Sequence, residues 1–398
     1  MESSRAVAEP TSAARGTLHE PGADVPRVLV VTNDFPPRVG GVQQYVWNLV
    51  RSLPSDRVAV LAPNWEGWKE HDAGQPFTVE RWPSTSLWPT GELVARVWSM
   101  ARSHRADVVL FGHGFPLPLL GPGLAERGTP YVVLTHGAEV WLARVPGVSS
   151  AMRRAFARAS EVTAISQYTA DALLPLMPPD EPLTLIFPAV DEERFSPRQE
   201  GTRVRERHGL EDRKVILCAS RLVPRKGQDV LIAGVGMVRD LLPEATLLLV
   251  GGGPYRARLD ELALAAPEGS VVFGGEVSDA ELPEFYAACD VFAMPCRSRW
   301  GGLEVEGFGI VFLEAAATGK AVVAGRSGGA AEALVDEETG LLVEGREPKA
   351  VALAIASLLR APEVAKKMGQ AGRLRVERSF TWANQSARLA EILRRAAG

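Results

Sequence analysis

Cysteine is scarce in this sequence, and the few cysteines do not form a recognisable site. The chain of 398 residues contains 3 Cys, at positions 218, 289 and 296. None of them forms a CxxC pair, and the odd number excludes a framework of disulfides. So little cysteine is typical of a protein from a reducing compartment, and we expect the chain to be cytoplasmic.

An excess of charge of one sign and long hydrophobic runs are also absent. The chain has 44 Lys and Arg against 48 Asp and Glu, a balance that argues against a nucleic-acid partner. The longest stretch without these residues, 108–125, contains 3 Pro and 4 Gly and therefore predicts a strand and a loop, not a membrane span. Residues 1–26 lack the apolar core of a signal peptide, and we predict a disordered tail.

Short apolar runs alternate with helical patterns along the rest of the chain. The run 28–31, Val-Leu-Val-Val, is typical of a strand covered on both faces of a parallel sheet. Further strands are expected at 58–61, 107–111, 131–134, 162–164, 215–219, 246–250, 271–273, 291–294, 321–324 and 341–343. Helices are expected between them, at 42–53, 92–105, 149–159, 230–242, 255–265, 279–288, 309–317 and 330–334. This alternation predicts an α/β protein with two doubly wound, Rossmann-like domains facing across a cleft.

Prolines and charges interrupt the alternation near 187–197, so we place the domain boundary there. The expected domains are 27–190 and 191–379. In such sheets ligands bind beyond the carboxyl ends of the strands, so the loops after the strands are the places to search for a site.

Two loops are suited to phosphate. Gly40-Gly41 lies between a strand and a helix, where a ligand can approach the backbone and the helix terminus favours an anion. A tight turn explains the two glycines equally simply. Arg221 and Lys226 follow the strand 215–219, and two cations at a strand end suit a diphosphate. A solvated basic loop is the alternative interpretation.

Three further residues have positions that suit a sugar nucleotide. Glu306 is expected in a loop, where it can accept sugar hydroxyl protons, and Glu314 in the following helix, from which it can reach a ribose. Glu314 stands among apolar residues, where a carboxylate needs a partner. His136 follows the strand 131–134 and can hydrogen-bond a substrate hydroxyl, although a lone histidine is often structural.

Gly251-Gly252-Gly253 also follows a strand and opens a helix, as in a dinucleotide-binding loop. Arg256 occupies the position of the third glycine of GxGxxG, although Glu276 stands near the end of the next strand, where a ribose-binding acid is expected. The motif is incomplete, which disfavours a nicotinamide-dependent oxidoreductase.

Taken together, these segments resemble the retaining glycosyltransferases of family 4, which have the two-domain GT-B fold. The most specific part is the set Arg221, Lys226 and Glu306-x7-Glu314, in that order and spacing. Val190-Asp191-x-x-x-Phe195-x-Pro197 looks like the family's passage between domains. The helix at 380–398 resembles the one that crosses back to the first domain in this family.

The resemblance also implies roles for individual residues. Arg221 and Lys226 neutralise the leaving diphosphate without a metal, Glu306 holds the donor sugar and Glu314 holds the ribose. His136 completes the catalytic set from the first domain. The remaining donor-binding positions implied by the family are Gly40, Gly41, Gly253, Val277, Phe308, Gly309 and Ile310. The departing phosphate is expected to deprotonate the acceptor, with retention of configuration, so no residue is assigned as a nucleophile.

Within the family, Thr32-Asn33-Asp34-Phe35-Pro36-Pro37 and Gly301-Gly302-Leu303-Glu304-Val305-Glu306-Gly307 are most similar to phosphatidylinositol mannoside mannosyltransferases. The resemblance implies an enzyme, a GDP-mannose-dependent α-mannosyltransferase with a phosphatidylinositol-mannoside-type lipid acceptor. It implies no cofactor and no metal. Use of a UDP-sugar or another acceptor by the same fold, and a non-catalytic nucleotide-sugar-binding protein, remain as alternatives.

A lipid acceptor requires contact with a membrane. Between residues 93 and 160 there are 8 Arg against 3 acidic residues, in a chain whose net charge is −4. Arg153, Arg154 and Arg158 fall in one of two amphipathic patterns there, which suits peripheral binding to anionic lipid on the cytoplasmic face. In the alternative interpretation the apolar stripes face the core and the arginines are merely solvated.

Overall fold

The computed structural model describes residues 24–179, 181 and 183–398. Most of the predicted tail therefore lies outside the described residues, but its end does not. Val25 is 2% exposed and belongs to the core of the first half, so the predicted boundary at residue 27 is wrong by at least two residues. Its side chain is apolar, so its burial three residues before the first strand is favourable.

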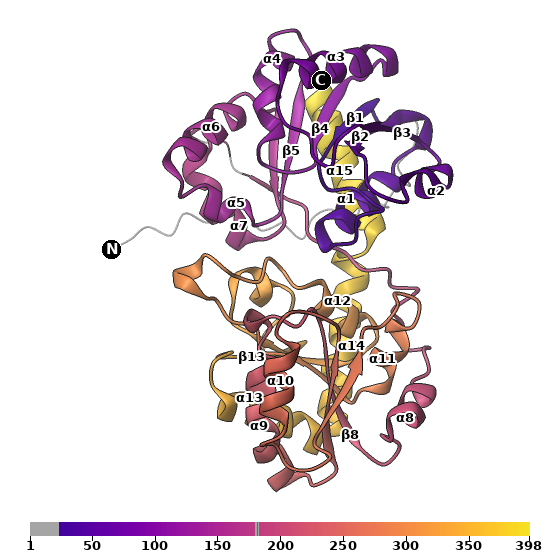
Figure 1. The fold of residues 1–398 in the computed structure, drawn as a ribbon, viewed down its shortest axis with the longest axis vertical. Coiled ribbons are helices and arrows are strands. Elements are labelled where there is room, and N and C mark those ends of the chain that lie inside the picture. The colour runs from indigo at the N-terminus through magenta and orange to yellow at the C-terminus, as the bar shows by residue number, and fades with distance from the viewer. Residues whose placement is uncertain (1–23, 180, 182) are drawn as a thin grey trace.

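The first half is built on a parallel sheet of seven strands in the order β3-β2-β1-β4-β5-β6-β7 (Figure 1). The predicted strand β1 is buried along its whole length, as a β-branched run between two layers of helices should be. The strands are β1 Val28–Val31, β2 Val58–Pro63, β3 Thr78–Trp82, β4 Val108–Phe111, β5 Tyr131–Thr135, β6 Glu161–Ala164 and β7 Thr184–Leu185. The helices are α1 Gly41–Arg51, α2 Trp68–Ala73, α3 Gly91–His104, α4 Gly121–Ala125, α5 Glu139–Leu142, α6 Pro146–Phe156 and α7 Gln167–Leu173, with 3-10 turns η1 Ser55–Arg57, η2 Leu117–Leu120 and η3 Leu174–Leu176.

The second half repeats the design with six parallel strands in the order β10-β9-β8-β11-β12-β13. Its strands are β8 Lys214–Ala219, β9 Ala245–Val250, β10 Val271–Gly275, β11 Val291–Met294, β12 Ala321–Gly325 and β13 Gly340–Val343. Its helices are α8 Thr202–His208, α9 Gln228–Leu241, α10 Arg256–Ala263, α11 Leu282–Ala288, α12 Ile310–Ala317, α13 Pro348–Arg360 and α14 Pro362–Ser379, with 3-10 turns η4 Pro224–Lys226, η5 Trp300–Gly302 and η6 Gly328–Glu332.

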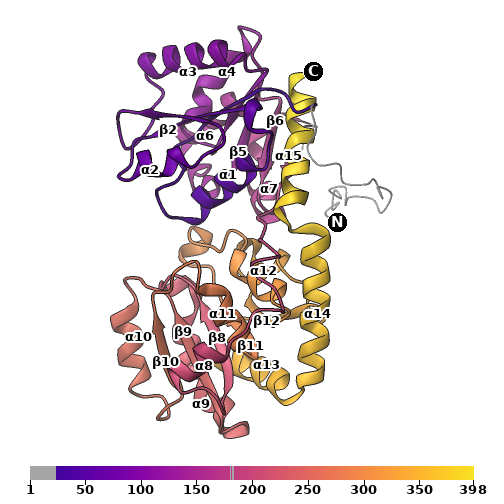
Figure 2. The ribbon, with the colours of Figure 1, turned by 90° about the vertical axis from the view of Figure 1, so that its right-hand side faces the viewer.

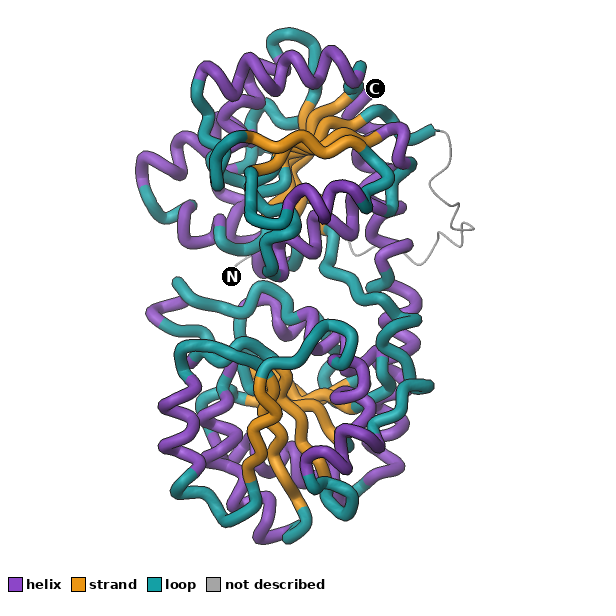
Figure 3. Tube along the Cα trace, turned by 45° about the vertical axis from the view of Figure 1, so that its right-hand side comes forward, coloured by secondary structure: helices purple, strands orange, loops and turns teal. Residues whose placement is uncertain are grey.

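Both sheets are doubly wound, as predicted. In each one the strand order reverses beside the first strand, between β1 and β4 and between β8 and β11. Loops leave the carboxyl ends of the strands at this reversal, and they form the ligand crevice of such folds. Figure 3 shows loops of the two halves, in teal, facing each other between the two groups of strands.

The last two helices run along one side of both halves (Figure 2). Helix α14 packs on α12 and β12 of the second half, whereas α15, Trp382–Ala397, contacts α1 and β5 of the first. Where α14 gives way to α15, the Val190 N–H donates to the carbonyl of Phe380 at 2.9 Å. Val190 itself packs in the core of the second half, one residue outside the expected domain 191–379.

The sequence did not predict every element. Strand β3 lies at the sheet edge, with residues that are half-buried or exposed, so it lacks a continuous apolar run. Strand β7 has only two residues. The expected helix at 330–334 is the 3-10 turn η6 instead. None of the described helices is both long enough and apolar enough to cross a membrane.

Candidate active site

A cleft of about 790 Å³ lies where loops of the two halves meet. Six of the predicted donor-binding residues line it: Gly40, Gly41, Arg221, Val277, Ile310 and Glu314. They come from α1 and from the loops after β8 and β10 and the start of α12. The structure thus brings together, at the carboxyl ends of two sheets, residues that are far apart in the sequence.

Helix α1 presents its N-terminus to this cleft. Gly40 and Gly41 line the opening, and a Cβ built on Gly41 would meet no atom within 4 Å. The free N–H groups of the first turn carry the positive end of the helix dipole. Such a terminus can donate hydrogen bonds to a phosphate oxygen, which stays the role predicted for Gly40 and Gly41.

Lys226 and Glu306 form an ion pair, and neither residue lines the cleft. Lys226 Nζ lies 2.7 Å from Glu306 Oε2, and each side chain is 10% exposed. Arg225 NH1 donates to the same carboxylate oxygen at 3.0 Å. The lysine has three N–H donors, so it can keep Glu306 and still bind an anion.

The two cations decide the charge of Glu306. Burial by itself raises the pKa of this carboxyl, but Lys226 and Arg225 outweigh burial through charge and hydrogen bonds, so the pKa is lowered. Glu306 is therefore an ionised acceptor held in place, which suits hydroxyl binding. A carboxylate shared by two cations is poorly suited to act as a nucleophile.

Glu314 lies on α12 and reaches the cleft from the second half. Its Oε2 accepts a hydrogen bond from the Tyr286 hydroxyl at 2.6 Å. Burial raises the pKa of Glu314, against the opposing effects of this hydrogen bond and of Arg194. The sequence indicated that this carboxylate needs a partner, but it did not identify Tyr286, which comes from α11 and also lines the cleft.

The two residues before α12 have different structural roles: Gly309 allows an unusual backbone conformation, and Phe308 packs against other rings. Gly309 has φ +88, and a Cβ there would lie 2.5 Å from the Phe312 ring, so glycine is required. Phe308 does not line the cleft: its ring packs against Phe187 and Phe380, with centroids 5.7 Å from each. The three rings join the two halves where the chain passes between them, which leaves only the backbone of Phe308 for a ligand.

Gly253 was predicted to line the nucleotide pocket, but it does not line the cleft. A Cβ on Gly253 would lie 2.4 Å from the carbonyl oxygen of Leu222, so this glycine allows two backbone segments to pack together. Gly251, two residues earlier, lines the cleft instead.

His136 lies after β5 in the first half. Its Nε2 donates to the carbonyl of Gly112 at 2.6 Å, because a carbonyl only accepts; in a neutral ring Nδ1 is then the acceptor. Its ring meets Tyr45, which lines the cleft, edge to face at 5.2 Å. A Cβ on Gly307 would lie 3.4 Å from the His136 carbonyl, so His136 stands next to the Glu306 loop.

Glu139 was missed by the sequence analysis. This buried carboxylate accepts the backbone N–H of Gly114 through Oε1 and that of His136 through Oε2, each at 2.9 Å. It fixes the loops after β4 and β5 relative to each other. Its place just after a buried strand was the available signal, since acids at that edge are candidates for site residues.

A second cluster missed from the sequence lies after β1 and β4. Asp34 accepts a hydrogen bond from Gln43 Nε2 at 2.6 Å and lies 3.6 Å from the buried His113 Nδ1. Burial lowers the pKa of His113, although Asp34 and Glu139 oppose this effect. His113 thus interacts electrostatically with Asp34, Glu139 and His136, but neither His113 nor Asp34 lines the cleft.

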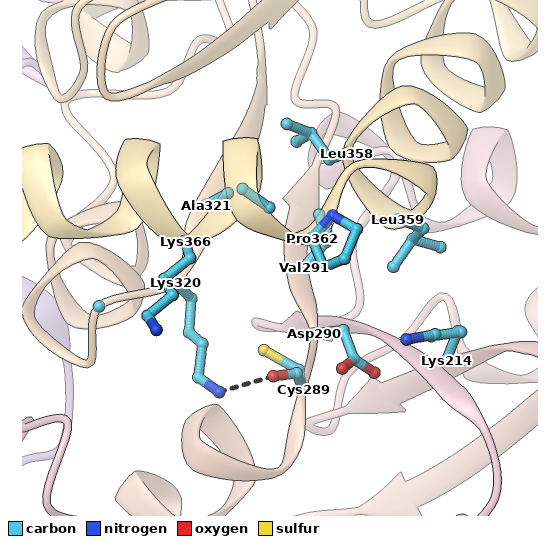
Figure 4. A pocket seen from close by; sticks show the side chains of 12 residues that line it. Lys214, Cys289, Asp290, Val291, Lys320, Ala321, Leu358, Leu359, Pro362 and Lys366 are labelled. Carbon is cyan, nitrogen blue, oxygen red and sulfur yellow. Dashed lines mark hydrogen bonds between the residues drawn. The ribbon is translucent and has the colours of Figure 1, made fainter.

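Another cavity, of about 220 Å³, lies elsewhere in the second half (Figure 4). It is lined by Lys214, Val291 and Ala321, the first residues of β8, β11 and β12. It is therefore at the amino ends of the strands, opposite the cleft. Lys320, which is also in its wall, already donates to the Cys289 carbonyl at 2.7 Å. Among the residues that the structure describes, no three His, Cys, Asp or Glu side chains gather as metal ligands.

Two family models match the chain with this architecture. The model "Glycosyltransferase Family 4" matches residues 39–194, and "Glycosyl transferases group 1" matches residues 201–375. The chain belongs to glycosyltransferase family 4. The resemblance inferred from Arg221, Lys226, Glu306 and Glu314 is thus confirmed at the level of the family.

Curated relatives of this family 4 chain are similar over nearly their whole length. A GDP-mannose-dependent alpha-(1-6)-phosphatidylinositol monomannoside mannosyltransferase of Mycolicibacterium smegmatis is 43% identical, over 92% of this chain and 98% of that protein. A protein of the same name from Mycobacterium tuberculosis (strain ATCC 25618 / H37Rv) is 41% identical over the same shares. A Corynebacterium glutamicum enzyme, named as acting on the monoacylated monomannoside, is 37% identical, over 92% of this chain and 97% of its own.

Solved structures confirm the predicted GT-B fold. Anabaena Alr3699/HepE in complex with UDP matches with a TM-score of 0.77 and 22% identity, over 92% of this chain and 98% of its own. WaaG, a glycosyltransferase of lipopolysaccharide biosynthesis, matches with a TM-score of 0.67 and 19% identity, over 92% of this chain and 99% of its own. At these identities the likeness concerns the fold alone.

The structure corrects one part of the membrane hypothesis. The apolar face of α6, with Met152, Ala155 and Phe156, is buried in the core of the first half. It is not available to insert into lipid. Arg153, Arg154 and Arg158 are exposed, so this segment offers charge to a surface, without an apolar stripe.

Proposed function

We propose that this family 4 enzyme is a retaining α-mannosyltransferase that moves mannose from GDP-mannose to a phosphatidylinositol-mannoside-type lipid. One observation carries the proposal: identity of 37–43%, over almost the full length, to enzymes named for that donor and that class of acceptor. Arg221 and Glu314, which line the cleft, are among the residues to which the proposal assigns the donor.

The cations of the second half hold the donor diphosphate in this proposal. Arg221 lines the cleft and has an exposed side chain, and Lys226 follows it by five residues in the same loop and pairs with Glu306. Together with the N-terminus of α1 they neutralise the charge that develops when the sugar leaves, which is where fixed dipoles and cations lower a barrier most. Neither group requires a metal ion.

Glu306 and Glu314 have different tasks. Glu306 is ionised between two cations and accepts hydrogen bonds from the hydroxyls of mannose, while Glu314 accepts those of the ribose. His136 belongs to the first half, and its Nδ1 accepts a hydrogen bond from a substrate hydroxyl in this proposal. The departing phosphate takes the acceptor proton, so neither carboxylate acts as the nucleophile of a glycosidase.

The test is transfer of radiolabelled sugar to lipid extract containing phosphatidylinositol mannosides, with GDP-mannose and UDP-glucose side by side in EDTA. We expect labelled lipid from GDP-mannose alone. Label from UDP-glucose points to the alternative donor, and label that disappears in EDTA contradicts the metal-free mechanism. If GDP-mannose is neither transferred nor hydrolysed while GDP still binds, the chain is a nucleotide-sugar-binding protein.

We also propose that the enzyme works as a peripheral protein on the cytoplasmic face of the membrane. The acceptor is a lipid, and Arg153, Arg154 and Arg158 expose three positive charges at the end of α6. Attraction of such residues to an anionic leaflet contributes about 1 kcal/mol per residue.

A further inference from the structure

Four exposed apolar residues lie on facing parts of the two halves. Trp141 and Val145, at α5 and just before α6, are 47% and 39% exposed. Trp300 and Leu303, at η5, are 69% and 50% exposed. We refer to these four residues as the apolar rim. Large apolar side chains gathered on a surface mark interaction sites.

One hydrogen bond connects the two parts of the rim. Arg144 NH1 donates to the carbonyl of Gly301 at 3.4 Å. Arg144 stands between Trp141 and Val145 in the sequence, and Gly301 directly follows Trp300. In Figure 1 the segment after β11, in orange, reaches toward α5 of the first half.

The backbone directs Trp300 outward. Trp300, Gly301 and Gly302 have φ values of +48, +64 and +85, all in the left-handed region. A bulky residue rarely adopts this conformation, and where it does, the surrounding fold imposes it. The Arg299 guanidinium lies 4.6 Å above the Trp300 ring, so the exposed indole carries a cation on one face.

Ion pairs connect this turn with the donor site. Arg299 NH1 lies 2.8 Å from Glu304 Oε2, and Arg225 Nε lies 3.7 Å from Glu304 Oε1. Arg225 in turn contacts Glu306, the partner of Lys226. Trp300 and Leu303 therefore belong to the same loop as Glu306, and ion pairs connect this loop to Lys226.

We propose that the apolar rim docks on the bilayer surface that contains the lipid acceptor. This inference rests on the proposed function, which supplies a lipid acceptor. Tryptophan suits this surface, because at the boundary between headgroups and acyl chains its apolar ring can be buried while its N–H stays hydrated. Bilayer contact is then made by both halves.

The charge around the rim favours an anionic surface. Arg144 and Arg299 flank the tryptophans, and Arg153 and Arg154 are exposed on the neighbouring helix α6. Of the nearby acids, Glu304 pairs with Arg299 and Arg225, and Glu139 is buried, with its oxygens accepting two backbone N–H groups. The exposed side chains of Arg144, Arg153 and Arg154 therefore leave positive charge beside the indoles, which fits a leaflet with phosphatidylinositol.

The experiment is sedimentation with phosphatidylcholine vesicles that contain or lack phosphatidylinositol. The variants are Trp300→Asn, because asparagine tolerates positive φ, and Trp141→Ser. The control is Trp88→Ser, which removes an indole that is 58% exposed but lies outside the rim. We expect each rim variant to bind phosphatidylinositol vesicles at least about fivefold more weakly, and the control to bind as the unaltered chain does.

Binding that is unchanged in both rim variants, or a loss of equal size in Trp88→Ser, overturns the proposal. Mannose transfer to a deacylated, water-soluble acceptor is measured in parallel. If transfer fails with every acceptor while vesicle binding still depends on Trp300, the proposed function is wrong and the docking surface stands. If transfer proceeds and vesicle binding ignores the rim, the docking surface alone is wrong.

Discussion

Lys226 Nζ and Glu306 Oε2 lie 2.7 Å apart, with both side chains 10% exposed, so the lysine expected to bind the donor diphosphate is already paired with a carboxylate. The pair fixes the position of both groups before any ligand arrives. Preorganised charge of this kind contributes to catalysis because no rearrangement is needed when the leaving group departs.

We expect Lys226→Ala to lower mannose transfer by about 10²–10³-fold, the usual effect of removing one group that stabilises a transition-state charge. Arg225→Ala is the matched variant, since Arg225 contacts the same oxygen of Glu306 at 3.0 Å. Initial rates and melting temperatures of both variants separate two roles. Equal losses of rate in both would mean that the lysine acts only by holding Glu306.

The lowered pKa of Glu306 predicts a dependence of stability on pH. A carboxyl whose pKa is lower in the folded than in the unfolded chain stabilises the fold above the unfolded value of about 4.3. That contribution is lost as the pH falls through the folded pKa. Glu306→Gln should therefore melt below the unaltered chain at pH 7, and the difference should shrink below about pH 4. A difference that stays constant across this range contradicts the assignment.

For Glu314 the expected dependence of stability on pH has the opposite sign. Its pKa is raised by burial, so its favourable contribution is complete below the unfolded pKa and lost as the pH rises through the folded one. Glu314→Gln keeps an acceptor for the Tyr286 hydroxyl and removes a partly buried charge. We expect a higher melting temperature at pH 8 and no gain at pH 4.

The same substitution should weaken the binding of GDP about tenfold, because a charged acceptor for the ribose becomes neutral. Calorimetric titration with GDP measures this effect. Tyr286→Phe is the companion variant, because it leaves the carboxylate but removes its hydrogen bond. Unchanged GDP affinity in Glu314→Gln would place the ribose elsewhere.

Replacing Arg153, Arg154 and Arg158 together by Ser should weaken binding to anionic vesicles by up to about 10²-fold at low salt, at about 1 kcal/mol per residue. The fold should be unaffected, since all three side chains are exposed. The control with equal charge change replaces Arg198, Arg203 and Arg207, which are exposed in the second half. A similar loss in the control means that net charge alone determines the binding.

Much of this protein could be predicted from its sequence. Apolar runs such as 28–31 predicted the central strands, because a strand covered on both faces has apolar residues at consecutive positions. The strand-helix alternation predicted two doubly wound sheets, and with it the edge where ligands bind. Gly41, Arg221 and Glu314 line the cleft at that edge. Each of them stands in a loop after a predicted strand or in the predicted helix that follows such a loop.

The tertiary structure decided what local patterns cannot specify. Only the packing of two loops joins Lys226 to Glu306, and only the crossing of the chain stacks Phe308 on Phe187 and Phe380. The apolar stripe of α6 has the same periodicity whether it faces a core or a membrane, so its burial had to be seen. The periodicity of apolar residues and the composition of loops can be read from neighbours along the chain. Which side chains far apart in the sequence contact each other depends on distances that only the folded chain sets.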